Sequence, residues 1–225
     1  MPSRPYGGSG FSLIEMAIVL FVLSLLIVGT LHGQELIGMT QEGKLSRDFN
    51  DLPTAINGYQ DRFRALPGDD RQAAAHLGSP DLENGNGSGR IDGNWTDVGA
   101  ASEASRAWLH LRLSGMIGGT TDPAAAEYTP RNVLGKPIGL QGGTDNPALS
   151  PIRDLAGNAI AGSVIFCSRG IPGKLAQTLE IKLDDGNPGT GCLLATRDTG
   201  SAYAPGAAAA TAIDPDGLYI VCRGV

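Results

Sequence analysis

The feature that most constrains this chain is an apolar run near its N-terminus. Residues 11–31 read FSLIEMAIVLFVLSLLIVGTL and carry one formal charge, that of Glu15. At about 1.5 Å of rise per residue, a helix of this length extends about 30 Å, the thickness of the hydrocarbon core of a bilayer. The run therefore predicts a transmembrane helix. A carboxylate in such a helix costs roughly 2.5 to 3.5 kcal/mol at mid-bilayer, so Glu15 is expected to have a function and a cationic partner.

A short polar leader, MPSRPYGGSG, precedes the apolar run. In a secretory signal peptide, an apolar stretch of about 7 to 15 residues is followed by a cleavage site of small residues. Here the apolar run is longer, and the small residues at positions 7–10 lie before it. The pattern therefore does not fit a signal peptide.

The junction GFSLIE, residues 10–15, resembles the processing site of type IV pilins and the related pseudopilins. The resemblance implies that a prepilin peptidase removes residues 1–10 by cutting after Gly10 and then methylates the new N-terminal Phe11. It also implies that Glu15 is used in assembly. On this basis residues 11–31 form the transmembrane and assembly segment of a longer N-terminal helix.

A second helical signal continues the first. Apolar residues recur at alternating spacings of four and three, with charged and polar residues between them. They are Leu45, Phe49, Leu52, Ile56, Tyr59, Phe63 and Leu66. Such a stripe is typical of an amphipathic helix with one buried face. The N-terminal helix is thus expected to span residues 11–66, with Pro53 removing a hydrogen bond in the region of Phe49.

Residues 67–225 are expected to form a globular, loop-rich α+β head. The 33 glycines of the 225-residue chain indicate many turns, and the net charge of −6 gives no reason to expect nucleic acid as a partner. Helices are predicted at residues 101–116 and 172–183, and strands at 163–167, 192–196 and 218–222, with a short strand at 137–140. The expected fold is pilin-like: the long helix packs on a small antiparallel sheet.

The three cysteines, Cys167, Cys192 and Cys222, lie in the last third of the chain and do not have zinc-site spacing. One disulfide and one free thiol are therefore expected. Laying residues 192–197 antiparallel to residues 217–222 places Cys192 opposite Cys222. The resemblance to prepilin-like proteins instead implies the pair Cys167–Cys222, which we expect, with Cys192–Cys222 as the alternative.

Residues 81–95, DLENGNGSGRIDGNW, are a weak candidate for a calcium loop. Asn84, Asn86, Ser88 and Asp92 fit ligand positions of such a loop, but its last position falls on Trp95, which cannot supply the bidentate carboxylate. A plain glycine–asparagine turn explains the segment equally well. Calcium is therefore a possible cofactor, and no other cofactor is expected.

The histidines, His32, His76 and His110, are isolated in the sequence, and no catalytic cluster is evident, so an enzyme is not expected. The resemblance implies a structural subunit of a type IV pilus-like filament. Its partners would be copies of itself or other pilins, the prepilin peptidase and an inner-membrane assembly platform. The precursor would lie in the bacterial inner membrane with its head in the periplasm, and the mature chain in a pilus or pseudopilus. The alternatives are a pseudopilin of a type II secretion or DNA-uptake machine, and a minor tip subunit whose head binds a surface or ligand.

Overall fold

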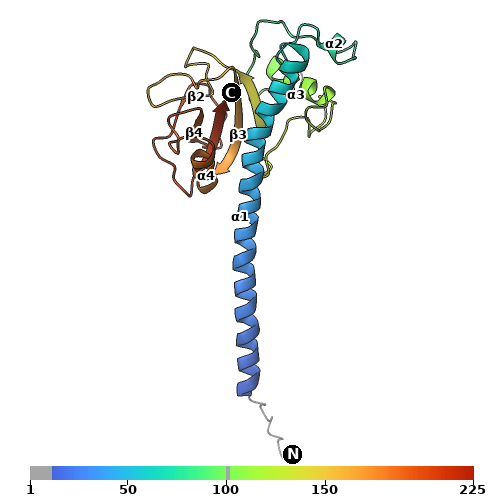
Figure 1. Ribbon diagram of the computed structural model, residues 1–225. Helices are drawn as coiled ribbons and strands as arrows, with labels where there is room; N and C mark the ends of the chain where they lie inside the picture. Colours follow the sequence, from blue (N-terminus) through green and yellow to red (C-terminus); the bar gives the residue numbers. More distant parts are fainter. Residues whose placement is uncertain (1–11, 100–101) are drawn as a thin grey trace, which may run out of the picture. The chain divides into compact units, whose positions relative to one another are not determined.

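The computed structural model describes residues 12–99 and 102–225, with no account of the side chains at residues 29–35 and 37 (Figure 1). Gly10 and Phe11 lie outside the described residues. The chain divides into two compact units, Met1–Gln41 and Glu42–Val225. Helix α1, Leu13–Phe63, begins in the first unit and ends in the second.

The transmembrane assignment of residues 11–31 is wrong for the described part of the chain, where no helix is both long enough and apolar enough to cross a membrane. Residue 11 and the side chains of residues 29–31 lie outside the description. Placement of the precursor in the inner membrane, with its head in the periplasm, depended on this span and is withdrawn with it.

The second unit is an α+β domain built on a four-stranded antiparallel sheet. Its strand order is β1 (Ile138–Gly142), β3 (Val164–Pro172), β6 (Leu218–Gly224) and β4 (Leu193–Arg197). The short strands β2 (Ile152–Arg153) and β5 (Ala207–Ala208) pair in parallel outside this sheet. The helices besides α1 are α2 (Ala73–His76), α3 (Glu103–Leu113) and α4 (Gly173–Leu183).

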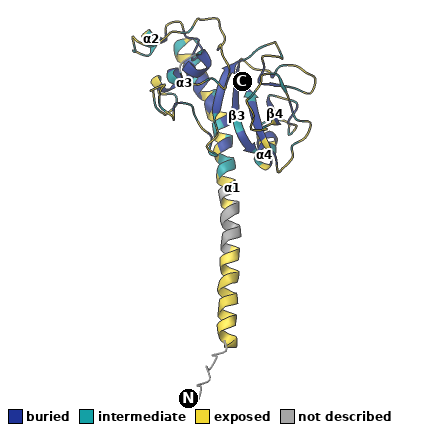
Figure 2. Cartoon of the chain, turned by 180° about the vertical axis from the view of Figure 1, so that it is seen from behind, coloured by how far each residue is buried: buried dark blue, intermediate teal, exposed yellow. Residues whose placement is uncertain are grey.

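One face of the sheet packs against helices. The predicted stripe on α1 is buried there, with Leu45, Phe49 and Tyr59 fully covered, and Phe49 contacts Phe166 of β3 edge to face, with ring centroids 4.8 Å apart. Apolar residues of α3 and α4 join the same cluster. Figure 2 marks the buried residues in dark blue on the strands and on the part of α1 beside them. The face was predictable because helical periodicity is a local property of the sequence.

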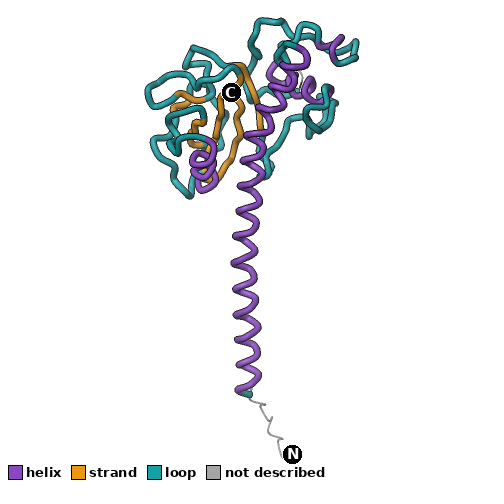
Figure 3. Tube along the Cα trace, in the orientation of Figure 1, coloured by secondary structure: helices purple, strands orange, loops and turns teal. Residues whose placement is uncertain are grey.

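The other face of the sheet packs against loops. Successive residues of a strand point to opposite faces, so Cys167, Ile220 and Leu194 belong to a second apolar cluster. Loop residues and Ile152 of β2 complete that cluster, and Figure 3 shows the teal loops on this side of the strands. Strand β5 was not among the strands predicted from the sequence.

A hydrogen bond from the sheet replaces the one that Pro53 removes from α1. Pro53 lies inside the helix and has no N–H to donate to the carbonyl of Phe49. Arg223 Nη1 of β6 donates to that carbonyl at 3.0 Å and to Asn50 Oδ1 at 3.0 Å. The proline therefore leaves the Phe49 carbonyl without its helical donor, and Arg223 of the sheet donates a hydrogen bond to that carbonyl instead.

Candidate functional site

The first part of α1 exposes apolar side chains around its whole circumference. Residues 13–28 contain no charged residue besides Glu15. Leu13 is 94% exposed, and Leu20 and Phe21, which lie on different sides of a helix, are 63% and 65% exposed. A helix that is apolar all round is normally buried in its working environment. This stretch of α1 is the candidate assembly segment.

Glu15 takes part in a capping box at the start of α1. The backbone N–H of Ser12 donates to Glu15 Oε2 at 2.8 Å, and the backbone N–H of Glu15 donates to Ser12 Oγ at 3.2 Å. The S-x-x-E spacing of residues 12–15 is the sequence signature from which this motif could have been predicted. Glu15 thus stabilises the start of α1, and its exposed carboxylate can also contact a neighbouring molecule.

The candidate calcium loop is held by two carboxylates that lie outside it. Asp69 accepts two hydrogen bonds from backbone N–H groups of the loop, and Glu103 accepts two more, at distances between 2.8 and 3.0 Å. The donors are the N–H groups of Asn86, Ser88, Gly89 and Asp92. Both carboxylate-bearing residues are almost fully buried. The loop thus directs backbone donors toward anionic side chains.

The four candidate ligands of this loop all take part in hydrogen bonds. Asn84 Oδ1 accepts from a backbone N–H of α2, and Asn86 Oδ1 accepts from the N–H of Ser88. The Ser88 hydroxyl donates to a backbone carbonyl two residues further on, and Asp92 Oδ2 accepts from the Asn86 amide. These bonds give each residue a structural role, and calcium binding here stays a prediction.

Cys167 and Cys222 form a disulfide between β3 and β6, where they lie directly opposite each other. This is the pair that the resemblance to prepilin-like proteins implied. The alternative alignment of β4 was wrong by two residues, because Leu194, not Cys192, lies opposite Cys222. Cys192 is the free cysteine of the chain.

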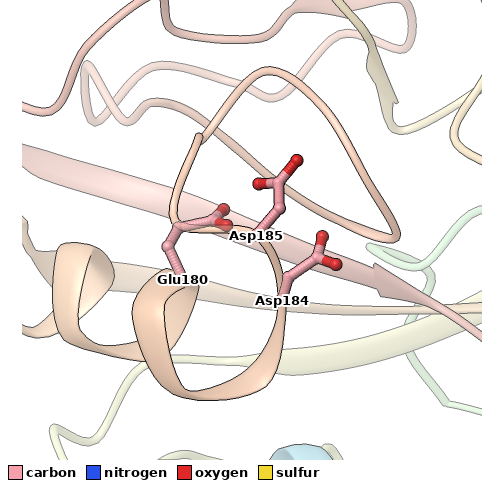
Figure 4. A group of neighbouring side chains, drawn as sticks. All are labelled: Glu180, Asp184 and Asp185. Carbon is pink, nitrogen blue, oxygen red and sulfur yellow. The ribbon is translucent and has the colours of Figure 1, made fainter.

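Three carboxylates meet at the end of α4, and the sequence analysis missed them. One oxygen from each of Glu180, Asp184 and Asp185 lies within 4.8 Å of the others (Figure 4). Glu180 is 0% exposed, and neither of its carboxylate oxygens has a hydrogen-bond partner among the described residues. Burial, and then the charges of Asp184 and Asp185, raise the pKa of Glu180 to about 9. The sequence shows the spacing of these acids but not the burial of Glu180.

A buried polar network lies where α1 ends. Asp70 Oδ2 accepts from the Tyr59 hydroxyl at 2.9 Å and lies 2.7 Å from His76 Nδ1. Burial by itself would raise the pKa of Asp70, but hydrogen bonds from His76, the backbone N–H of Gln72 and Tyr59 outweigh it and lower the pKa. The network joins α1 to α2, so His76 is not isolated in the fold.

The chain has no match among protein-family models, curated proteins or solved structures.

Proposed function

We propose that this chain is a structural subunit of a type IV pilus-like filament, in which copies pack through the apolar first part of α1. The observation that carries the proposal is the apolar surface of residues 13–26, exposed around the whole helix and interrupted only by Glu15 and Ser24. A copy of the same helix offers a matching apolar surface. Burying such side chains contributes roughly 25 cal/mol for each Å² of apolar area removed from water.

Glu15 has a specific role in this proposal. Inside a bundle of helices its carboxylate would lose its water and would need a cation. Cleavage after Gly10 would create one, the N-terminal amine of Phe11, and a neighbouring copy would supply it. Because desolvation consumes much of the attraction, the pair would fix the register between copies more than it would add stability. A prepilin peptidase and an assembly platform are the partners that the proposal requires.

The capping box offers a different explanation for Glu15, and substitutions can separate the two. Glu15→Gln keeps a side chain that can complete a capping box but removes the charge. Ser12→Ala removes the reciprocal hydroxyl and keeps the charge. Glu15→Ala removes both the charge and the side chain that completes the capping box. Each variant is expressed as the sole copy of the chain in a strain whose own copy is deleted.

We expect Glu15→Gln and Glu15→Ala to be cleaved but absent from sheared surface filaments, and Ser12→Ala to assemble. Removing one partner of a buried ion pair costs roughly 3 to 5 kcal/mol per contact, enough to prevent incorporation. The measurement is an immunoblot of the sheared and cell-associated fractions, with loss of the leader checked by mass spectrometry. Normal incorporation of Glu15→Gln would reject the ion pair and leave Glu15 with its capping role alone.

A further inference from the structure

The acidic cluster, defined as Glu180, Asp184 and Asp185, lies where negative charge is least favourable. The C-terminal end of a helix carries a partial negative charge, which favours cations and disfavours carboxylates. Lys182, the basic residue in the last turn of α4, forms an ion pair with Glu42 of α1 instead. No described residue forms an ion pair with a member of the cluster.

Glu180 is the member that requires an explanation. Its side chain is fully buried, its two oxygens have no hydrogen-bond partner among the described residues, and Figure 4 shows it beside the other two acids. A buried carboxyl group without a partner is costly, and a buried carboxylate needs a counter-charge. Ionised neighbours such as Asp184 and Asp185 offer only acceptors. A cation between the three groups would supply what Glu180 lacks.

The two aspartates are held in place by the loop that follows α4. Asp184 Oδ2 accepts from the backbone N–H of Leu193 at 2.8 Å, and Asp184 Oδ1 lies 3.5 Å from the Cys192 thiol. Asp185 accepts from a backbone N–H two residues on at 2.8 Å and from the Thr190 hydroxyl at 2.6 Å. Ionised carboxylate oxygens have further lone pairs, so these bonds orient the ligands and leave them able to coordinate.

We propose that the acidic cluster binds one Ca²⁺ ion. Ca²⁺ prefers carboxylate and other oxygen ligands at 2.3–2.6 Å, so two ligands on opposite sides of the ion lie at most about 5 Å apart. The spacing of up to 4.8 Å within the cluster fits that limit. Mg²⁺, with ligands at 2.0–2.1 Å, would need oxygens within about 4.2 Å. Water or backbone oxygens would complete the six to eight ligands of Ca²⁺.

The site would join the end of α4 to the start of β4, because Asp184 also holds the backbone of Leu193. This inference goes beyond the proposed filament role and does not depend on it. It also assigns calcium to a place other than the loop at residues 84–92.

The test uses the full chain, purified in a mild detergent and freed of metal with EDTA. Binding is measured by equilibrium dialysis with ⁴⁵Ca²⁺ and by melting curves with and without calcium. We expect the wild-type chain to bind one Ca²⁺ ion. Relative to wild type, the Kd for Ca²⁺ should be at least 100-fold higher for Glu180→Gln and at least 10-fold higher for Asp185→Asn. Asp92→Asn is the matched control, because it neutralises a carboxylate in the other candidate loop, and its Kd should stay within twofold of wild type.

Each result decides the proposal. A calcium-dependent rise in melting temperature that Glu180→Gln abolishes supports it. Absence of binding at millimolar calcium overturns it, as does a site that Asp92→Asn abolishes while Glu180→Gln keeps it. Tighter binding of Mg²⁺ than of Ca²⁺ overturns the identity of the ion. If circular dichroism shows that Glu180→Gln does not fold, Asp185→Asn decides, because Asp185 is exposed and its isosteric replacement leaves the core intact.

Discussion

His110 shows how burial changes the chemistry of a single residue. It lies on α3 with 0% exposure, and its Nδ1 accepts a hydrogen bond from the backbone N–H of Gly68 at 2.9 Å. Burial lowers the pKa of His110 to about 4; the charge of Asp70 opposes this shift and that of Arg106 adds to it. In the folded chain the imidazole is therefore neutral at pH 7 and acts as an acceptor for the turn after α1.

This shift predicts a loss of stability in acid. In the unfolded chain His110 binds a proton near pH 6.5, whereas in the folded chain it does so only near pH 4. The contribution of neutral His110 to the free energy of unfolding is thus complete above pH 6.5, and it decreases as the pH falls toward 4. Wild type should lose about 2 kcal/mol of unfolding free energy relative to His110→Asn between pH 7.5 and 4.5. The asparagine cannot titrate but keeps an acceptor for Gly68.

The measurement is urea unfolding of both proteins at several pH values in EDTA. Glu180, whose pKa is raised, has the opposite effect, because the folded chain binds its proton first as the pH falls. Glu180 is present in both proteins, so the difference between them isolates His110. Parallel stability curves would contradict the assigned role of His110.

At the scale of elements, the contact between α1 and the sheet depends on a hydrogen bond that neither forms alone. Phe49 has a carbonyl without an intrahelical donor because of Pro53, and Arg223 of β6 supplies the donor. A buried acceptor that loses its partner costs roughly 1 to 3 kcal/mol. The sequence shows the proline, but only the packing of α1 on β6 shows which residue compensates for it.

A double-mutant cycle tests this compensation. Arg223→Met should lower the unfolding free energy by roughly 1 to 3 kcal/mol in the wild-type chain. In a Pro53→Ala background the new backbone N–H can bond the Phe49 carbonyl, so the same substitution should cost about 1 kcal/mol less. Asn50→Ala serves as the control for the second hydrogen bond of Arg223. Equal costs in both backgrounds would show that Arg223 does not compensate for the proline.

At the scale of the whole head, the disulfide ties together the two central strands of the sheet. Cys167 and Cys222 are fully buried and are separated by 55 residues, which include α4, β4 and β5. A crosslink over a loop of this length reduces the entropy of the unfolded chain, and the loop-closure model predicts a stabilisation of about 4 kcal/mol.

The double substitution Cys167→Ala/Cys222→Ala should therefore lower the unfolding free energy by roughly 2 to 5 kcal/mol, measured in urea. Cys192→Ser, which changes the free cysteine, is the matched control and should stay within about 1 kcal/mol of wild type. Reducing agent should destabilise wild type and leave the double variant unchanged. A double variant as stable as wild type would show that the strand ladder alone holds β3 and β6.

Several features of the fold could be predicted from the sequence because they depend on neighbours along the chain. The part of the stripe from Leu45 to Phe63 predicted which side of α1 is buried, and the segments predicted as strands near β3, β4 and β6 do form strands. The assembly role of Glu15, inferred from its apolar context and from the resemblance, stays a prediction. The capping box of Ser12 and Glu15 could also have been predicted, from the spacing of the two residues.

Other features depend on contacts between distant segments, and only the tertiary structure decided them. The register of β4 on β6 placed Leu194 opposite Cys222, and the order of the strands brought Cys167 to that cysteine instead. The length of the N-terminal apolar run suggested a membrane span that the described structure does not support. Glu180 lies on α4 in a sequence where nothing distinguishes it from an exposed acid. Its burial is set by the packing of the surrounding chain, and this burial makes the acidic cluster a candidate cation site.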